Sequence, residues 1–209
     1  IKVFIDFCFR YAKIICMRLD HIAYRVKDRY RTAKFIEDTL EYTISTEFQI
    51  EFDDGSKADC LALIPPEKRP KETHEWVNNT DLCHENYKEG ITDGLGVEQD
   101  ITYHAPPEIF VSDGSPGSIV GDWVAARSDV GGVHHVAYQV DNVEAKMKEW
   151  KDAGYAEFLS DKPMTCPGLV QVFTKPSELT GVIYELISRE DKGFCEDNVK
   201  DLMLSTVND

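Results

Sequence analysis

Two histidines at matched places in a repeated sequence, together with one acid, could bind a metal ion. His21 lies in LDHIAYRV and His135 in VHHVAYQV, two runs in which His, Ala, Tyr and Val coincide. Glu185 stands in the otherwise apolar run GVIYELI, where a lone charge is costly unless it is paired or bound to metal. Two imidazoles and a carboxylate are a donor set that divalent metals accept.

The alternation of side chains along a strand indicates which histidine could face a common cleft. Neighbouring strand residues point to opposite faces, and His21 and His135 each share a face with a small alanine two residues later. His134 falls on the other face, where we expect a capping or surface group. A purely structural interpretation stays open, in which both matched histidines are hydrogen-bonded strand residues and Glu185 pairs with an arginine.

The elements that would position these residues also repeat. Each copy of the strand is followed by a polar cap, an amphipathic helix pattern and three further strand candidates. The candidates span 44–52, 58–64 and 108–112 in the first copy, and 155–159, 169–174 and 182–188 in the second. The unit therefore reads βαβββ twice, which predicts an α+β fold of two paired modules.

The repeat also predicts how the chain is divided. We expect an N-terminal extension at 1–16, a first module at 17–130 with a long polar insertion at 65–106, a second module at 131–190 and a C-terminal helix at 191–209. A loop as long as this insertion is usually functional or disordered. Histidines in or beside the insertion are commonplace in exposed loops: His74, His84 and His104.

The composition limits the classes of partner. The 209 residues carry a formal net charge of -15, which argues against nucleic acid and anionic membrane, since both reward clustered Lys and Arg. A small-molecule substrate and a second copy of the chain, as a homodimer, are the partners that we expect. The 6 cysteines lie far apart without a CxxC pair, so we expect reduced thiols in a cytoplasmic protein.

The runs LDHIAYRV, GGVHHVAYQV and VIYELISR together resemble the vicinal oxygen chelate superfamily of glyoxalases, bleomycin resistance proteins and dioxygenases. This resemblance implies that the two paired βαβββ modules form a cupped mixed sheet around a metal site. The C-terminal third looks most like the 4-hydroxyphenylpyruvate dioxygenase family, through GLVQVFTKP (168–176), YELISR (184–189) and GFCEDNVKDL (193–202). This resemblance implies a non-haem Fe(II) dioxygenase acting on a small 2-oxo acid, with His21, His135 and Glu185 as iron ligands. Mn, Co, Zn and Ni are the alternative metals.

The same resemblance implies roles around the metal. Gln171 would orient the substrate and Phe173 would form a wall of its pocket. The purely structural alternatives stay open, in which Gln171 is a polar strand residue and Phe173 is an ordinary core residue. Phe194 would begin a terminal helix that closes the site. The family's enzymes are longer and carry a further pair of modules, and Val199 stands where that family has a phenylalanine, which puts an aromatic substrate in doubt.

A second resemblance points to different chemistry. Residues 108–140 are similar to the segment that joins the modules of methylmalonyl-CoA epimerase-like proteins, which implies Glu108 as an additional metal ligand. Four protein ligands would leave fewer open positions and favour epimerase or glyoxalase-type isomerase or lyase chemistry. Two prolines precede Glu108 and leave its register open. A third class, a non-catalytic small-molecule binding protein of the same fold, also stays open.

Overall fold

The structure is a computed structural model that describes residues 17–66, 107–189 and 194–206. From Leu19 onward, the described elements belong to one compact unit of the chain; a second unit consists of residues 1–18 and 68–105. The predicted extension at 1–16 and nearly all of the insertion at 65–106, with His74, His84 and His104, lie outside the described residues. No helix in the described ranges is long and apolar enough to span a bilayer.

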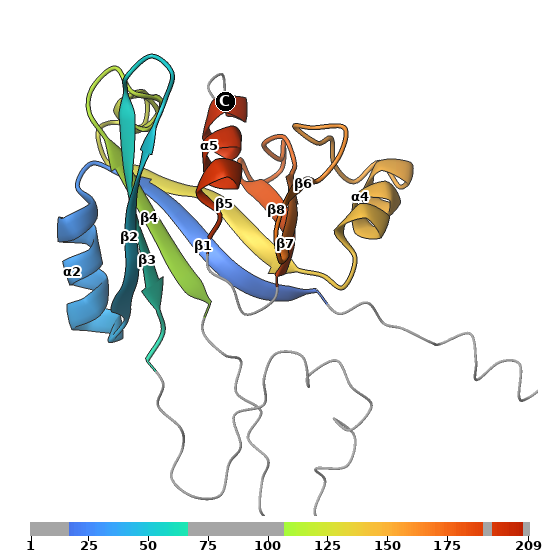
Figure 1. Cartoon of the computed structure of the whole chain (residues 1–209), viewed down its shortest axis with the longest axis horizontal. Helices are drawn as coiled ribbons and strands as arrows, with labels where there is room; N and C mark the ends of the chain where they lie inside the picture. Colours follow the sequence, from blue (N-terminus) through green and yellow to red (C-terminus); the bar gives the residue numbers. More distant parts are fainter. Residues whose placement is uncertain (1–16, 67–106, 190–193, 207–209) are drawn as a thin grey trace, which may run out of the picture. The chain divides into compact units, whose positions relative to one another are not determined.

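A single curled sheet of eight strands holds the two predicted modules side by side (Figure 1). The strands run in the order β2-β3-β4-β1-β5-β8-β7-β6. The first module comprises β1 (Arg18–Val26), α2 (Arg29–Leu40), β2 (Thr43–Glu51), β3 (Lys57–Ile64) and β4 (Glu108–Gly114). The second comprises β5 (Gly131–Gln139), α4 (Val143–Asp152), β6 (Met164–Cys166), β7 (Leu169–Phe173) and β8 (Ile183–Arg189). The predicted α+β fold is confirmed.

The strand pairing is the same in both modules. The first strand of each module runs parallel to its last, β1 to β4 and β5 to β8. The remaining pairs within a module are antiparallel. Because β1 and β5 are neighbours at the centre of the sheet, the two matched histidine strands lie side by side.

Two predictions about secondary structure were wrong. Residues 155–159 do not form a strand: Gly154 turns the chain after α4 with a φ of 68°, Tyr155 is 74% exposed, and only Phe158 forms an isolated bridge, to Thr174. The second strand of the second module is instead the short β6. In addition, a helix that we did not anticipate, α3 (Ile119–Ala125), lies between β4 and β5 and is capped by Ser118.

The two faces of the sheet are covered by different helices. In the first module, α2 packs through Ala33 and Ile36 on residues such as Leu61. The preceding residue, Cys60, points to the opposite face of the sheet. There it packs in a cluster with residues of α3 and of α5 (Glu196–Ser205). The C-terminal helix α5 therefore covers the inner face of the sheet, which also carries the candidate functional residues.

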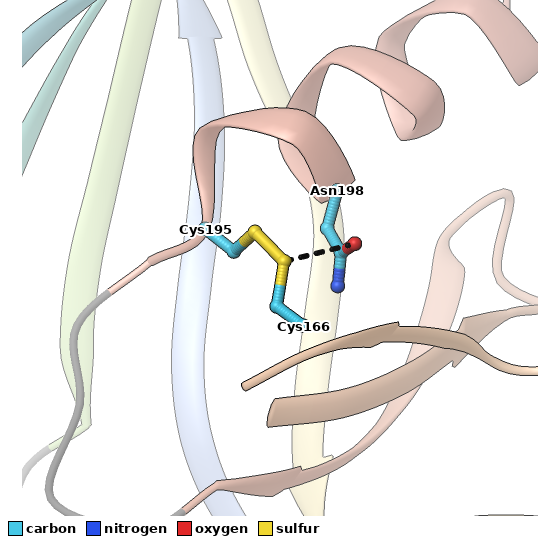
Figure 2. Close-up of a disulfide and its surroundings, with 3 residues drawn as sticks. All are labelled: Cys166, Cys195 and Asn198. Atoms are coloured by element: carbon cyan, nitrogen blue, oxygen red, sulfur yellow. Dashed lines mark hydrogen bonds between the residues drawn. A yellow bond between two sulfur atoms is a disulfide. The ribbon is translucent and has the colours of Figure 1, made fainter. Parts of the chain in front are cut away.

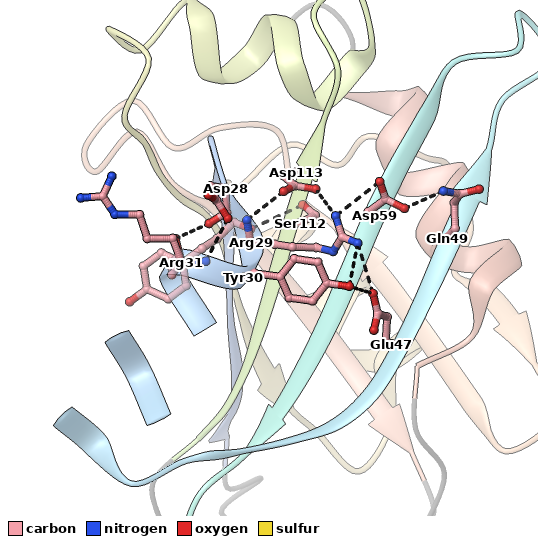
Figure 3. Close-up of polar contacts among 11 residues, drawn as sticks. Asp28, Arg29, Tyr30, Arg31, Glu47, Gln49, Asp59, Ser112 and Asp113 are labelled. Atoms are coloured by element: carbon pink, nitrogen blue, oxygen red, sulfur yellow. Dashed lines mark hydrogen bonds and ion pairs between the residues drawn. The ribbon is translucent and has the colours of Figure 1, made fainter. Parts of the chain in front are cut away.

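The start of α2 is tied to three strands by one arginine (Figure 3). Asp28 caps the helix by accepting a hydrogen bond from the backbone N–H of Arg31 at 2.9 Å. Arg29 then pairs with a carboxylate on each of β4, β3 and β2: Asp113 at 3.0 Å, Asp59 at 3.4 Å and Glu47 at 3.1 Å. These contacts fix α2 on the outer face of the sheet.

The prediction that all the cysteines are reduced is contradicted by a disulfide between Cys166 of β6 and Cys195, the residue before α5. Figure 2 shows this bridge with Asn198 beside it, whose Oδ1 lies 3.4 Å from Cys166 Sγ. The bridge could not be predicted from the sequence, because the two cysteines are separated by 29 positions and are brought together only by the fold. The bridge ties α5 to the second module. Cys60 is free and buried.

Candidate metal centre

Three buried side chains from three neighbouring strands meet at the centre of the sheet. His21 comes from β1, His135 from β5 and Glu185 from β8, and they are 2%, 5% and 1% exposed. The two Nε2 atoms are 3.2 Å apart, and Glu185 Oε2 lies 3.2 Å from that of His21 and 3.3 Å from that of His135. Among the described residues, these three form the one group of histidine, cysteine and acidic side chains whose donor atoms could share an ion.

These separations fit a metal ion. Donors that each touch one ion at about 2.1 Å lie about 3.0 to 3.4 Å apart on one face of an octahedron or a tetrahedron. The three measured separations fall within this range. The two imidazoles and the carboxylate are also the ligand types that such ions select. The residues present therefore suit a divalent metal.

His21 is oriented by an acidic residue that precedes it. Its Nδ1 lies 2.8 Å from Asp20 Oδ1, so an Nδ1–H donates to the carboxylate and Nε2 is left to bind an ion. Burial alone would raise the pKa of Asp20, but the hydrogen bonds and charges of His21 and Arg189 lower it. Arg189 holds Asp20 from the other side, with Nε donating to Oδ2 at 3.1 Å.

His135 is oriented by a second imidazole. Its Nδ1 lies 2.9 Å from His134 Nδ1. If His135 binds an ion through Nε2, its Nδ1 carries the proton and donates to His134, whose own proton is then on Nε2. Burial, together with the nearby positive charge of Arg25, holds the pKa of His134 well below 6.5.

The expectation that His134 is a capping or surface group was wrong, because the residue is 4% exposed and lines the central pocket. The pairing of β5 with β8 begins only at His135. His134 lies within β5, one residue before that pairing begins, and its ring packs against Trp123 of α3 at 5.6 Å between centroids rather than facing solvent.

Burial and the neighbouring charges shift the pKa values of all three central groups. Burial would lower the pKa of His21, but the negative charge of Glu185 and the hydrogen bond to Asp20 outweigh it and raise this pKa to about 9. Burial would raise the pKa of Glu185, but the two histidines lower it to about 2. Burial dominates at His135 and lowers its pKa. In the metal-free protein, a proton on His21 thus takes the place of a cation beside Glu185.

The register of the sheet places Glu108 outside this cluster. In the second module Glu185 is level with Ala137 of β5, two residues beyond His135. The matching partner in the first module, level with Ala23 of β1, is Phe110. Glu108 is level with His21 itself, and its carboxylate pairs with Arg189 at 2.8 Å. A phenylalanine therefore occupies the place that corresponds to Glu185.

A pocket with an empty volume of about 410 Å³ lies over the cluster. Gln171 and Phe173 of β7 both line it, as the sequence predicted, and the Phe173 ring contacts His135 edge to face at 5.4 Å between centroids. Phe194, just before α5, contacts the His21 ring in the same manner at 5.0 Å. Three residues of α5 close the opposite wall: Val199, Leu202 and Met203.

Arg25 is a pocket residue that the sequence analysis did not select. It lies on the same face of β1 as His21, is 2% exposed, and lines the pocket. Its Nη2 donates to the Thr206 hydroxyl at the end of α5, at 2.9 Å. The alternation along LDHIAYRV could have identified Arg25, because it puts this charged residue on the same face as His21. A charge there is costly unless it is paired or binds a ligand.

Solved structures with this fold include methylmalonyl-CoA epimerases and a 4-hydroxymandelate synthase. A methylmalonyl-CoA epimerase matches with a TM-score of 0.56 and 18% identity, covering 86% of this chain and 99% of the epimerase. That of Mycobacterium tuberculosis matches with a TM-score of 0.53 and 14% identity, covering 86% and 91%. A mutant of 4-hydroxymandelate synthase from Streptomyces coelicolor matches with a TM-score of 0.61 and 18% identity, covering 90% of this chain and 53% of the synthase.

The sequence itself identifies the superfamily. No curated protein matches the chain. The sequence model of the glyoxalase/bleomycin resistance protein/dioxygenase superfamily, however, matches residues 20–166. This segment contains His21, His135 and nearly all of the first module, and it ends before Glu185. The chain therefore belongs to the glyoxalase/bleomycin resistance protein/dioxygenase superfamily.

Proposed function

We propose that the protein is a metal-dependent enzyme that binds a divalent ion through His21, His135 and Glu185. The reaction that this site supports best is oxidation of a small 2-oxo acid by dioxygen, with Fe(II) as the metal. The substrate would supply all four electrons that dioxygen takes up: one oxygen atom would enter the carboxylate left after loss of CO2, and the other would hydroxylate the remaining chain. Fe(II), held by the three residues, would supply the place where the 2-oxo acid and dioxygen meet. The observation that carries this proposal is the cluster of three donors, in which Phe110 stands where a fourth protein ligand would come.

The remaining pocket residues would bind the substrate and exclude water. Gln171 is buried and can donate and accept hydrogen bonds beside the three donors. Phe173 and Phe110 supply apolar walls. Phe194 and α5 cover the cluster and keep bulk water from the reacting groups, as closing elements do in other enzymes.

A second candidate reaction is metal-dependent proton transfer, as in an epimerase. The similarity to two methylmalonyl-CoA epimerases over nearly their whole length favours it. In that reaction the metal would polarise a carbonyl, and an acidic group would move the proton. Against it, Glu185 is the one acid among the described residues that line the pocket, and both neighbouring histidines already engage it.

Oxygen uptake distinguishes the two reactions. Protein loaded anaerobically with Fe(II) should consume oxygen when a 2-oxo acid is added, and Glu185→Gln should abolish this uptake. Proton exchange next to a carbonyl without oxygen uptake would instead support the epimerase class. Retained metal and no turnover of either kind would support a binding protein. Glu108→Gln is the matched control, since its carboxylate pairs with Arg189, and we expect it to keep both metal and activity.

A further inference from the structure

The pocket over the metal centre contains a buried cation. Arg25 is four positions after His21 on β1, so that their Cα atoms lie about 13 Å apart along the strand. Both side chains are on the inner face and both line the same pocket. The guanidinium donates to Thr206 at 2.9 Å, and because it has five donor hydrogens it can bind several acceptors at once.

A second donor lies near Arg25. His134 lines the pocket, is 4% exposed, and its Nε2 has no hydrogen-bond partner among the residues that the structure describes. A buried polar atom without a partner is costly, and substrate could supply the missing acceptor. In the tautomer that leaves His135 Nε2 for a metal ion, His134 Nε2 carries a proton and can donate it.

The two donors share one neighbour. The Arg25 Cζ atom lies 5.6 Å from the centre of the Trp123 ring, and the His134 ring contacts the same tryptophan at 5.6 Å between centroids. Ser112, which is level with Arg25 on the adjacent strand β4, also lines the pocket. Arg25, His134 and Ser112 thus line one part of the pocket, which adjoins the candidate ligand His135 through the contact between its Nδ1 and His134 Nδ1 at 2.9 Å.

We propose that Arg25 and His134 form an anion-binding subsite, and that the substrate is a 2-oxo acid with a second carboxylate at its far end. The inference rests on the proposed function, because the metal centre would hold the 2-oxo acid group. The chain between the two acid groups would contact Phe110 and Phe173. Arg25 then determines specificity. A substrate that ends in a carboxylate would bind its guanidinium, whereas a substrate that ends in a neutral phenol would gain little affinity from this contact.

A matched pair of ligands tests the subsite. 2-Oxoadipate and 2-oxohexanoate have the same number of carbons and differ in the terminal carboxylate. We expect 2-oxoadipate to bind the anaerobic Fe(II) protein about tenfold more tightly, the order of a hydrogen bond to a charged group. Isothermal titration gives both dissociation constants without turnover. Equal affinities of the two ligands for the unaltered protein would overturn the subsite.

Variants then assign the preference to Arg25. Arg25→Gln should weaken 2-oxoadipate to the affinity of 2-oxohexanoate and leave the latter unchanged, and Arg25→Lys should keep part of the preference. Arg127→Gln is the control, because Arg127 stacks on Trp123 at 3.6 Å but does not line the pocket. A preference that persists in Arg25→Gln would contradict the proposal. If Arg25→Gln does not fold, His134→Gln tests the same subsite and should reduce the preference.

Failure of the metal centre can be recognised separately. Metal affinity is measured first, without any oxo acid. Should the protein bind no metal, 2-oxoadipate must still raise the thermal unfolding temperature of the metal-free protein more than 2-oxohexanoate does, and Arg25→Gln must remove that difference. Absence of this difference overturns the subsite, whereas absence of metal overturns only the proposed function.

Discussion

The histidine of the first module is held by a carboxylate, whereas the histidine of the second is held by another imidazole. His21 Nδ1 is 2.8 Å from Asp20, and His135 Nδ1 is 2.9 Å from His134. Asp20 and His134 occupy the same position of the repeat. The negative charge beside His21 helps to raise its pKa, while the pKa of His135 is lowered by burial. The two matched histidines therefore have unlike basicity.

The same contrast extends to the last strand of each module. Glu185 of β8 corresponds in register to Phe110 of β4. On the first strands, Arg25 corresponds in the repeat to Gln139. The second module thus supplies the acidic ligand candidate, and the first supplies the cation and an aromatic wall. The duplication preserves the pair of histidines, and the differences between the halves give the pocket two distinct ends.

The largest effect is expected from removing the acid that only one module has. Glu185→Ala should weaken metal binding by more than about a hundredfold. Loss of a residue that only orients a ligand already costs up to about a hundredfold, and Glu185 would be a ligand itself. Adding Phe110→Glu to this variant should restore part of the affinity, because the two positions correspond in register. Competition with a chelator measures both. No recovery would mean that the two halves are not interchangeable at this position.

The second prediction concerns α5, which is covalently tied to one module and packs on the other. Cys166 joins it to β6, while Val199 and Met203 pack in the core cluster of the first module. Replacing Cys195 by serine should lower the free energy of unfolding by about 3 kcal/mol, the order for a closed loop of this length. Urea titration of this variant and of Cys60→Ser, which removes the free thiol, tests this. An equal loss in both would contradict a specific tether.

The third prediction compares the groups behind the two histidines. Asp20→Asn should weaken metal binding about ten- to a hundredfold, because it removes the carboxylate that accepts the His21 Nδ1–H and helps Glu185 to keep this histidine basic. His134→Gln should cost less, since a neutral acceptor replaces a neutral one. Both effects can be measured by titration with Co(II), followed through its absorption. A larger loss for His134→Gln would reverse the inferred ranking of the two modules.

The fourth prediction is a pair of opposite pH trends. The pKa of His21 is raised to about 9, so its stabilising effect on the metal-free protein is complete below about pH 6.5 and is lost as the pH rises through 9. Metal must displace this proton, so metal affinity should instead increase about tenfold per unit as the pH rises toward 9. Thermal unfolding with and without metal tests both trends. Parallel trends would show that His21 does not exchange its proton for the ion.

Much of the fold was predictable because the repeat carries it. The matched runs around His21 and His135 and the lone Glu185 predicted that these three residues converge, and the structure brings them together. That they bind a metal stays a prediction. The strand at 155–159 was misplaced because an apolar pattern after α4 does not reveal the turn at Gly154, where φ is 68°.

Other features depend on register and on distant contacts, which a sequence pattern does not contain. Glu108 was assigned by symmetry with Glu185, but the pairing of β1 with β4 puts Phe110 at that level. The bridge between Cys166 and Cys195 depends on how α5 returns to the sheet. His134 was misjudged because the sequence pattern did not reveal α3, whose Trp123 packs against its ring.

The most direct test of the central claim is a crystal structure of the Co(II)-loaded protein with anomalous scattering from the metal. We expect one ion within about 2.0 to 2.2 Å of His21 Nε2, His135 Nε2 and a Glu185 carboxylate oxygen. Glu108 should remain paired with Arg189. An ion held elsewhere, or one that takes Glu108 as a fourth protein ligand, would contradict the account.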